Sequence, residues 1–103
     1  MTRPLAVTVR HDLGAAEARR RVDKGFRRLA QQIGVGLGTI EKDWKDNELA
    51  FSTATLGEAV SGRVSIEDER IRIVVDLPDF LGLMARRIGS RLRREAERLL
   101  EKK

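Results

Sequence analysis

The sequence predicts an α+β protein, a two-layer sandwich in which two amphipathic helices cover one face of an antiparallel sheet. Five segments alternate apolar with polar residues, two longer segments repeat apolar residues every three or four positions, and the last four strands have short connections. The predicted order is β-α-β-β-β-β-α, and stacking both helices on one side of the sheet buries every apolar face. No repeat or linker interrupts the chain, so we expect one domain over residues 1–103.

The first strand and the first helix are predicted from a change of period. Residues 5–10 alternate apolar and polar side chains, as a half-buried strand does. Residues 15–33 repeat apolar side chains at helical spacing and therefore form an amphipathic helix. Gly14 is the expected N-cap, and Gly34 and Gly36 are expected to end this helix.

Four further strands are predicted in the middle of the chain, where alternation returns between turn-forming residues. We expect these strands over residues 40–44, 49–53, 60–66 and 71–77. The expected turns are Asp46-Asn47, Gly57 and Glu67-Asp68-Glu69. The last strand is the clearest, because β-branched residues dominate it and arginines occupy alternate positions.

A second helix is predicted after Pro78, with Asp79 as its N-cap. Its apolar stripe is Leu81, Met84, Ala85, Ile88, Leu92, Ala96 and Leu99. Leu83 falls almost opposite this stripe, and Leu100 lies to one side. Phe80 and Leu83 are therefore candidate apolar contacts for a partner surface. The alternative is that both side chains cover the end of the sheet or pack in a dimer.

Positive charge is concentrated on the two predicted helices. The chain carries 21 Lys+Arg and 16 Asp+Glu, a net charge of +5. Residues 15–33 hold six basic and two acidic residues, and residues 79–103 hold eight and four, so each helix carries +4 and the remainder carries −3. The basic residues opposite the apolar stripes are Arg20, Lys24, Arg27, Arg28, Arg86, Arg87, Arg94 and Arg98.

Two interpretations of these basic faces are open. They are a solvated helix surface, partly neutralised by i, i+4 pairs of Arg91 with Glu95 and of Arg93 with Glu97. Alternatively, they attract a polyanion such as nucleic acid or acidic lipid. The sequence offers few aromatic residues for base stacking, with one Trp, three Phe and no Tyr.

Several classes of chemistry are excluded or disfavoured by composition. The absence of cysteine excludes disulfides, thiol catalysis and thiolate metal sites. His11 is the sole histidine; it is either an acid or base oriented by Asp12, or a structural residue at a turn. No motif predicts an enzyme, a cofactor or a metal site. No apolar run is long enough for a membrane span or a signal peptide, so we expect a cytoplasmic protein.

Several short patterns follow one another along the chain. They are His11-Asp12-Leu13-Gly14, Glu17-Ala18-Arg19-Arg20, Trp44 before a turn, Phe51, Gly62-Arg63-Val64-Ser65-Ile66, Ile71-Arg72-Ile73, Leu77 and the leucine- and arginine-rich last helix. From about residue 7 to residue 100, this ordered pattern resembles the small bacterial polyhydroxyalkanoic acid system proteins. The resemblance implies a role in the storage of polyhydroxyalkanoate polyester granules, and it carries no catalytic residues.

The leading hypothesis is therefore a non-enzymatic accessory protein that associates with the granule or with a granule protein. The alternative is a small polyanion-binding module that uses the basic outer faces of the helices. A third hypothesis, a small molecule bound between sheet and helices, requires a cavity. A homodimer is open as well, because the second face of the sheet suits either water or a polar dimer interface. That face carries Thr8, Ser61, Arg63, Ser65, Arg70 and Arg72.

Overall fold

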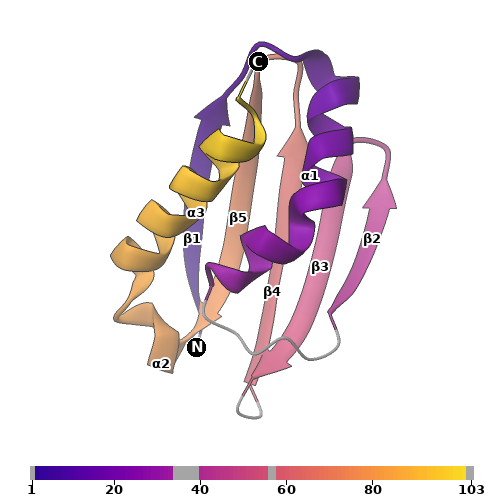
Figure 1. Cartoon of the computed structure of the whole chain (residues 1–103). Helices are drawn as coiled ribbons and strands as arrows, with labels where there is room; N and C mark the ends of the chain where they lie inside the picture. The colour runs from indigo at the N-terminus through magenta and orange to yellow at the C-terminus, as the bar shows by residue number, and fades with distance from the viewer. Residues whose placement is uncertain (1, 34–39, 56–57, 102–103) are drawn as a thin grey trace.

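The computed structural model describes residues 2–33, 40–55 and 58–101, apart from the side chains at 2, 3, 54, 55, 58 and 80. Its elements are β1 (Thr2–Arg10), α1 (Gly14–Gln31), β2 (Glu41–Lys45), β3 (Glu48–Thr55), β4 (Glu58–Ile66), β5 (Arg70–Pro78), α2 (Asp79–Gly82) and α3 (Ala85–Leu99). The strands form one antiparallel sheet in the order β1-β5-β4-β3-β2 (Figure 1). The predicted fold class and element order are confirmed, except that the last helix is divided.

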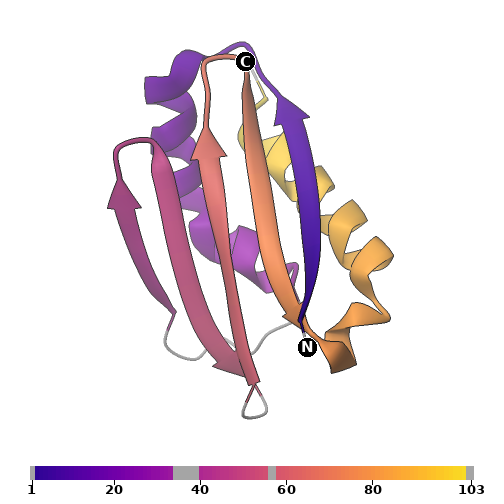
Figure 2. The ribbon, with the colours of Figure 1, turned by 180° about the vertical axis from the view of Figure 1, so that it is seen from behind.

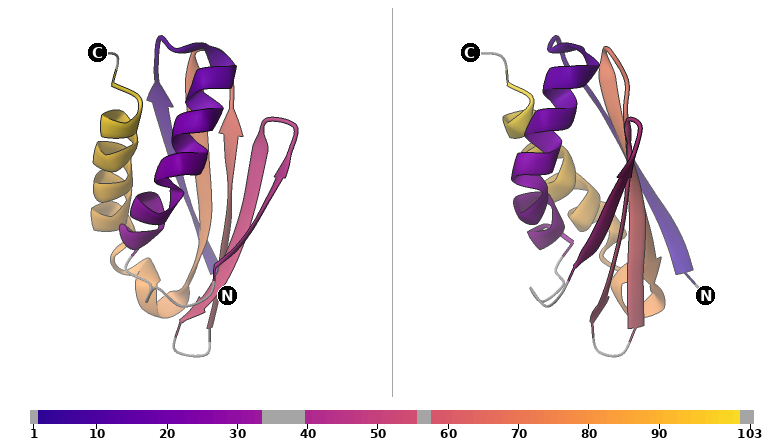
Figure 3. Two further views of the ribbon diagram at one scale, coloured as in Figure 1. Left: turned by 45° about the vertical axis from the view of Figure 1, so that its right-hand side comes forward. Right: turned by 90° about the vertical axis from the view of Figure 1, so that its right-hand side faces the viewer.

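The helices lie on one face of the sheet and leave the other face uncovered. Figure 2 shows the uncovered face, and Figure 3 shows the two layers from the side. Strands β2 to β5 form the predicted meander, and β1 joins its far edge by pairing with β5. The turn at Asp46 is confirmed, with a left-handed φ of 56°. The glycines at 34, 36 and 57, predicted to end a helix and to form a turn, lie outside the described residues.

The core fills the space between the two layers. Val22 and Phe26 of α1 and Ile88 and Leu92 of α3 are buried against the inner face of the sheet. The rings of Phe26 and Phe51 meet edge to face, with centroids 5.2 Å apart. A void between the layers, lined by eight apolar residues, has a volume of about 10 Å³. This void has room for at most about one water molecule, which excludes the predicted alternative of a small-molecule site there.

Helices α1 and α3 touch where Gly25 faces Leu99. A Cβ atom at Gly25 would overlap the end of the Leu99 side chain, so glycine allows the close approach. Arg21 reinforces this contact by donating a hydrogen bond to the Leu99 carbonyl at 3.2 Å. The contact holds the two helices in one layer beside the sheet (Figure 3).

The start of α1 differs from the prediction. The N-cap is Leu13 rather than Gly14, and Gly14 is the first helical residue, with a φ of 78°. Glycine suits this left-handed backbone because it has no Cβ. The carboxylate of Asp68, in the β4–β5 turn, accepts a hydrogen bond from the Ala15 N–H at 3.3 Å. A residue distant in sequence thus satisfies an N–H of the first helical turn.

The prediction of one continuous second helix is wrong. The Met84 N–H donates to the Leu81 carbonyl at 3.0 Å in a tight turn, and the Ile88 N–H then donates to the Met84 carbonyl at 2.9 Å as α3 begins. The N-cap of α2 is Pro78, and Asp79 is the first helical residue rather than the cap. The chain bends here because it leaves the end of β5 and must run back over the sheet beside β1 (Figure 1).

Two apolar side chains of the last helical segment differ in burial from the prediction. Met84 was expected in the core but is 40% exposed, because the stripe of α3 begins anew after the bend. Leu100 was expected to one side, yet it is buried, since its N–H continues the last turn by donating to the Ala96 carbonyl at 3.0 Å.

Both edges of the sheet are protected from pairing with further strands. At the β1 edge, the Arg93 guanidinium donates to the Thr8 carbonyl at 2.9 Å and occupies a free backbone acceptor. At the opposite edge, β2 has only five residues, and four of them are exposed and charged: Glu41, Lys42, Asp43 and Lys45. Short strands and charged side chains are common means of blocking sheet edges.

Candidate interaction surfaces

The first candidate surface, which we call the basic helical surface, consists of the eight predicted basic residues. All eight side chains are exposed on the helical layer, and they are Arg20, Lys24, Arg27 and Arg28 from α1 with Arg86, Arg87, Arg94 and Arg98 from α3. The fold therefore brings the basic sides of two distant segments onto one side of the molecule (Figure 1).

One member of this surface is neutralised locally. The Arg20 guanidinium donates two hydrogen bonds to the Glu17 carboxylate at 2.8 and 2.7 Å, and Arg21 donates a third at 2.9 Å. The hydrogen bonds from Arg20 and then Arg21 lower the pKa of Glu17 from 4.5 to about 2. Within the described ranges, the cationic groups of the other seven form no ion pair or hydrogen bond.

The predicted i, i+4 pairs on α3 do not form. Among the described side chains, Arg91 and Glu95 make no ion pair with each other, and neither do Arg93 and Glu97. Arg93 instead reaches the backbone of β1. The charge of α3 is therefore less compensated than the sequence suggests.

The second candidate surface comprises the bend between α2 and α3 together with the start of α3, over residues 82–90. We call it the helix elbow. Leu83 is 90% exposed and is the most exposed large apolar side chain described. Leu83 and Met84 border a shallow hollow together with Arg86, Arg87 and Ser90. The predicted apolar exposure of Leu83 is confirmed, whereas Phe80 lies in α2 with a side chain outside what the structure describes.

A polar cluster that the sequence did not reveal joins β2 to α1. The Trp44 indole N–H and the Lys42 ammonium donate to the same Asp23 carboxylate oxygen, at 2.8 and 3.0 Å. The Trp44 bond and, second, the Lys42 bond lower the pKa of Asp23. The Arg19 guanidinium lies 4.4 Å from the Trp44 ring centroid. These contacts attach the edge strand to the helical layer and involve no cleft.

His11 forms hydrogen bonds with backbone groups through both of its ring nitrogens. Its side chain is buried, its Nδ1 accepts from the Leu13 N–H at 3.2 Å, and its Nε2 lies 3.0 Å from the Glu67 carbonyl. Because Nδ1 is an acceptor, Nε2 carries the proton and donates to Glu67. Both ring nitrogens are thus occupied by backbone groups that join the β1–α1 connection to the β4–β5 turn.

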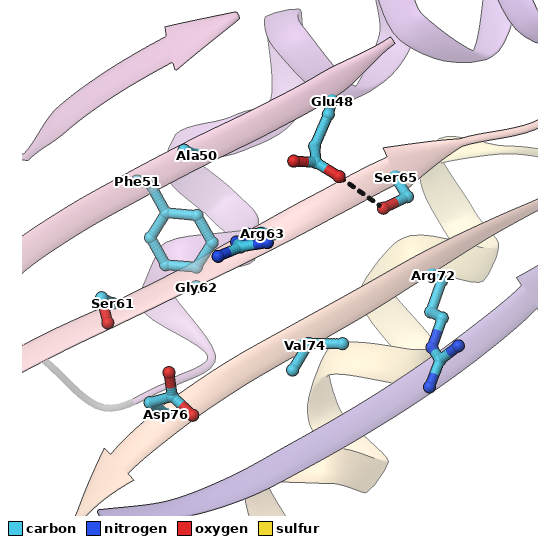
Figure 4. A pocket seen from close by; sticks show the side chains of 10 residues that line it. All are labelled: Glu48, Ala50, Phe51, Ser61, Gly62, Arg63, Ser65, Arg72, Val74 and Asp76. Atoms are coloured by element: carbon cyan, nitrogen blue, oxygen red, sulfur yellow. Dashed lines mark hydrogen bonds between the residues drawn. The ribbon is translucent and has the colours of Figure 1, made fainter. Parts of the chain in front are cut away.

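A shallow trough, with a volume of about 510 Å³, lies on the uncovered face of the sheet (Figure 4). It is lined by Glu48, Ala50, Phe51, Ser61, Gly62, Arg63, Ser65, Arg72, Val74 and Asp76. Its charged side chains are two arginines and two carboxylates, so its formal charge is balanced. One hydrogen bond joins two of its polar side chains, from the Ser65 hydroxyl to Glu48 at 3.4 Å.

The described residues contain no group of three or more His, Asp or Glu side chains arranged to hold a metal ion. None of the helices described has the length and apolar character needed to cross a bilayer.

Comparison with known proteins gives one match. The model of a family described as "Putative polyhydroxyalkanoic acid system protein" matches residues 5–100. No curated protein and no solved structure matches the chain.

Proposed function

This chain belongs to the family of polyhydroxyalkanoic acid system proteins, and from that premise we propose that it attaches to the polyester granule, or to a protein on it. In this proposal the protein is a non-enzymatic accessory factor of the cytoplasmic granule. The helix elbow makes the apolar contact, and the basic helical surface beside it meets acidic groups at the granule boundary.

The exposure of Leu83 carries the proposal. A leucine that is 90% exposed gains about 1.5–3 kcal/mol when an apolar surface buries it. Met84 adds to the exposed apolar area of the helix elbow, and Arg86 and Arg87 follow in the first turn of α3. Apolar side chains beside arginines are typical of segments that adsorb at an interface between water and an apolar phase.

Granule co-sedimentation of the purified chain tests this proposal. The substitution Leu83→Asn is expected to lower the bound fraction several-fold. In the bound state the granule would bury this side chain, and the amide of asparagine would have to lose its hydration there. Ala16→Asn is the matched control, because Ala16 is exposed at the opposite end of the helical layer. This variant should bind granules as the unmodified chain does. In cells, a fluorescent fusion that stays diffuse among granules contradicts the proposal.

The seven uncompensated cations favour a second candidate, a polyanion-binding module. Nucleic acid or acidic lipid would then bind across α1 and α3 with an affinity that falls steeply with salt. Arg27→Ala with Arg28→Ala would weaken such binding and reduce the salt slope, whereas Leu83→Asn would not. Absence of binding to DNA, RNA and acidic vesicles at low salt contradicts this candidate.

A further inference from the structure

The uncovered face of the sheet has a regular pattern of charged and small side chains. Strand pairing places Glu48, Ser65 and Arg72 in one row across β3, β4 and β5. The next row is Ala50, Arg63 and Val74, followed across β1 by Ala6. The third row sets Ser61 beside Asp76. All of these face away from the helices, because the residues between them along each strand point into the core.

The charged groups on this face are not neutralised within one copy. Among the described residues, Arg63 and Arg72 form no ion pair or hydrogen bond, and Glu48 contacts only the Ser65 hydroxyl. Figure 4 shows both arginines and both carboxylates in the trough without a link between opposite charges. Two positive and two negative groups thus remain available to a partner.

The open shape of the trough disfavours a small-molecule partner. Pockets for small ligands enclose most of the ligand surface, whereas this trough lies open on the uncovered face of the sheet. Its balanced charge also disfavours a simple anion. A broad partner that carries both signs of charge fits the face better.

We propose that this partner is a second copy of the chain, packed sheet to sheet about a two-fold axis. The axis runs parallel to the strands, between β4 and β5. Such an axis places β4 of one copy over β5 of the other, so the interface uses the same residues twice. The small side chain of Ala50 then faces the partner's Ala6, which lets the two sheets approach closely.

This arrangement pairs every charge of the trough with an opposite charge. Arg63 lies over the partner's Val74 and reaches the partner's Asp76, one row further along the same strand. Arg72 lies over the partner's Ser65, beside the partner's Glu48. The two-fold axis repeats both pairs. Complementary charges of this kind fix the register of an interface.

The available area is sufficient for a reversible dimer. Strands β1, β4 and β5 have nine residues each and β3 has eight. At about 4.8 Å between strands and about 3.3 Å per residue, the overlapping part of the sheet offers roughly 600 Å² per copy. Two copies bury about 1,200 Å², the lower end of the range for specific interfaces. An interface of this size is typical of weak, reversible association.

Sedimentation equilibrium of the full chain tests the proposal through charge reversal. The unmodified protein is expected to approach twice its mass of 11.6 kDa as concentration rises. The substitution Arg63→Glu places a negative charge next to the partner's Asp76. The substitution Asp76→Arg places a positive charge next to the partner's Arg63. Each single variant is expected to weaken association by about 100-fold or more. The double variant restores opposite charges and should associate within about tenfold of the unmodified chain.

Arg27→Glu is the matched control, because it makes the same charge change on the basic helical surface. It should dimerise normally, and circular dichroism should show that every variant is folded. The proposal is overturned by an unmodified chain that stays monomeric up to about 500 µM, by single variants that associate normally, or by a double variant that does not recover. An Arg27→Glu variant as weak as Arg63→Glu would overturn it too, because net charge would then explain the effect.

Discussion

The indole N–H of Trp44 on β2 donates a hydrogen bond to the carboxylate of Asp23 on α1 at 2.8 Å, across the gap between an edge strand and the helical layer. Lys42 donates to the same oxygen at 3.0 Å. Because β2 is short and lies at the edge of the sheet, this carboxylate is a main attachment of the strand to the helices.

Asp23→Ala is therefore expected to loosen β2. The loss of these hydrogen bonds should lower the free energy of unfolding by about 0.5–1.5 kcal/mol. The tryptophan emission should shift to longer wavelength, since Trp44 is the sole tryptophan and becomes more hydrated. Asp43→Ala, an exposed position on the same strand, should leave both measurements unchanged.

Stability should fall in acid as Glu17 becomes protonated. The pKa of Glu17 is lowered from 4.5 to about 2 in the folded chain by its bonds with Arg20 and Arg21. The unfolded chain takes up this proton first as pH falls, so the contribution of Glu17 is complete above about pH 4.5 and is lost towards pH 2. In thermal melting, the Glu17→Gln variant should lose less stability over this pH interval than the unmodified chain does. An equal loss of stability in both proteins would contradict the role of Glu17 in this acid dependence.

Gly62→Ala should destabilise the sheet. An added Cβ would lie 2.6 Å from the Phe51 ring and 2.6 Å from the backbone carbonyl of Val74. Since the carbonyl belongs to a paired strand and cannot move aside easily, we expect a loss of about 1–3 kcal/mol in chemical denaturation. Ser52→Ala on the neighbouring strand β3, where the serine is exposed, is the control and should have little effect.

His11→Ala should reduce stability without affecting the proposed attachment to granules. The Leu13 N–H and the Glu67 carbonyl both lose a buried partner, which costs about 1–3 kcal/mol. Asp12→Ala is the neighbouring control, because Asp12 is exposed. A His11→Ala variant with normal stability but altered granule binding would assign this residue a functional role instead.

The fold was predictable because alternation and helical spacing report burial directly. Phe26 lies in the helix predicted over residues 15–33 and Phe51 in the strand predicted over residues 49–53, and their rings meet in the core. The elbow was not predictable, since Leu81, Met84 and Ala85 fit one helical stripe whether or not the helix is continuous. The change of direction that divides the last helical segment into α2 and α3 depends on where β5 ends relative to β1. That position is a property of the assembled sheet.

The residues of the candidate surfaces were predictable from the sequence, but the hydrogen bonds between distant segments were not. The eight basic residues and Leu83 were found from helical position alone, and all nine are exposed. The neutralisation of Arg20 by Glu17 follows an i, i+3 spacing that was visible in the sequence. The links of Trp44 with Asp23 and of Arg93 with Thr8 join distant segments, and no local signal encodes them.

The bond from Arg93 to the Thr8 carbonyl has a consequence for a protein crowded onto a surface. High local concentration favours strand-by-strand growth into fibres wherever a sheet edge is open. With Arg93 blocking one edge and the charged strand β2 forming the other, addition of strands is disfavoured at both sides. The sheet can then reach a high local concentration without growing strand by strand at its edges.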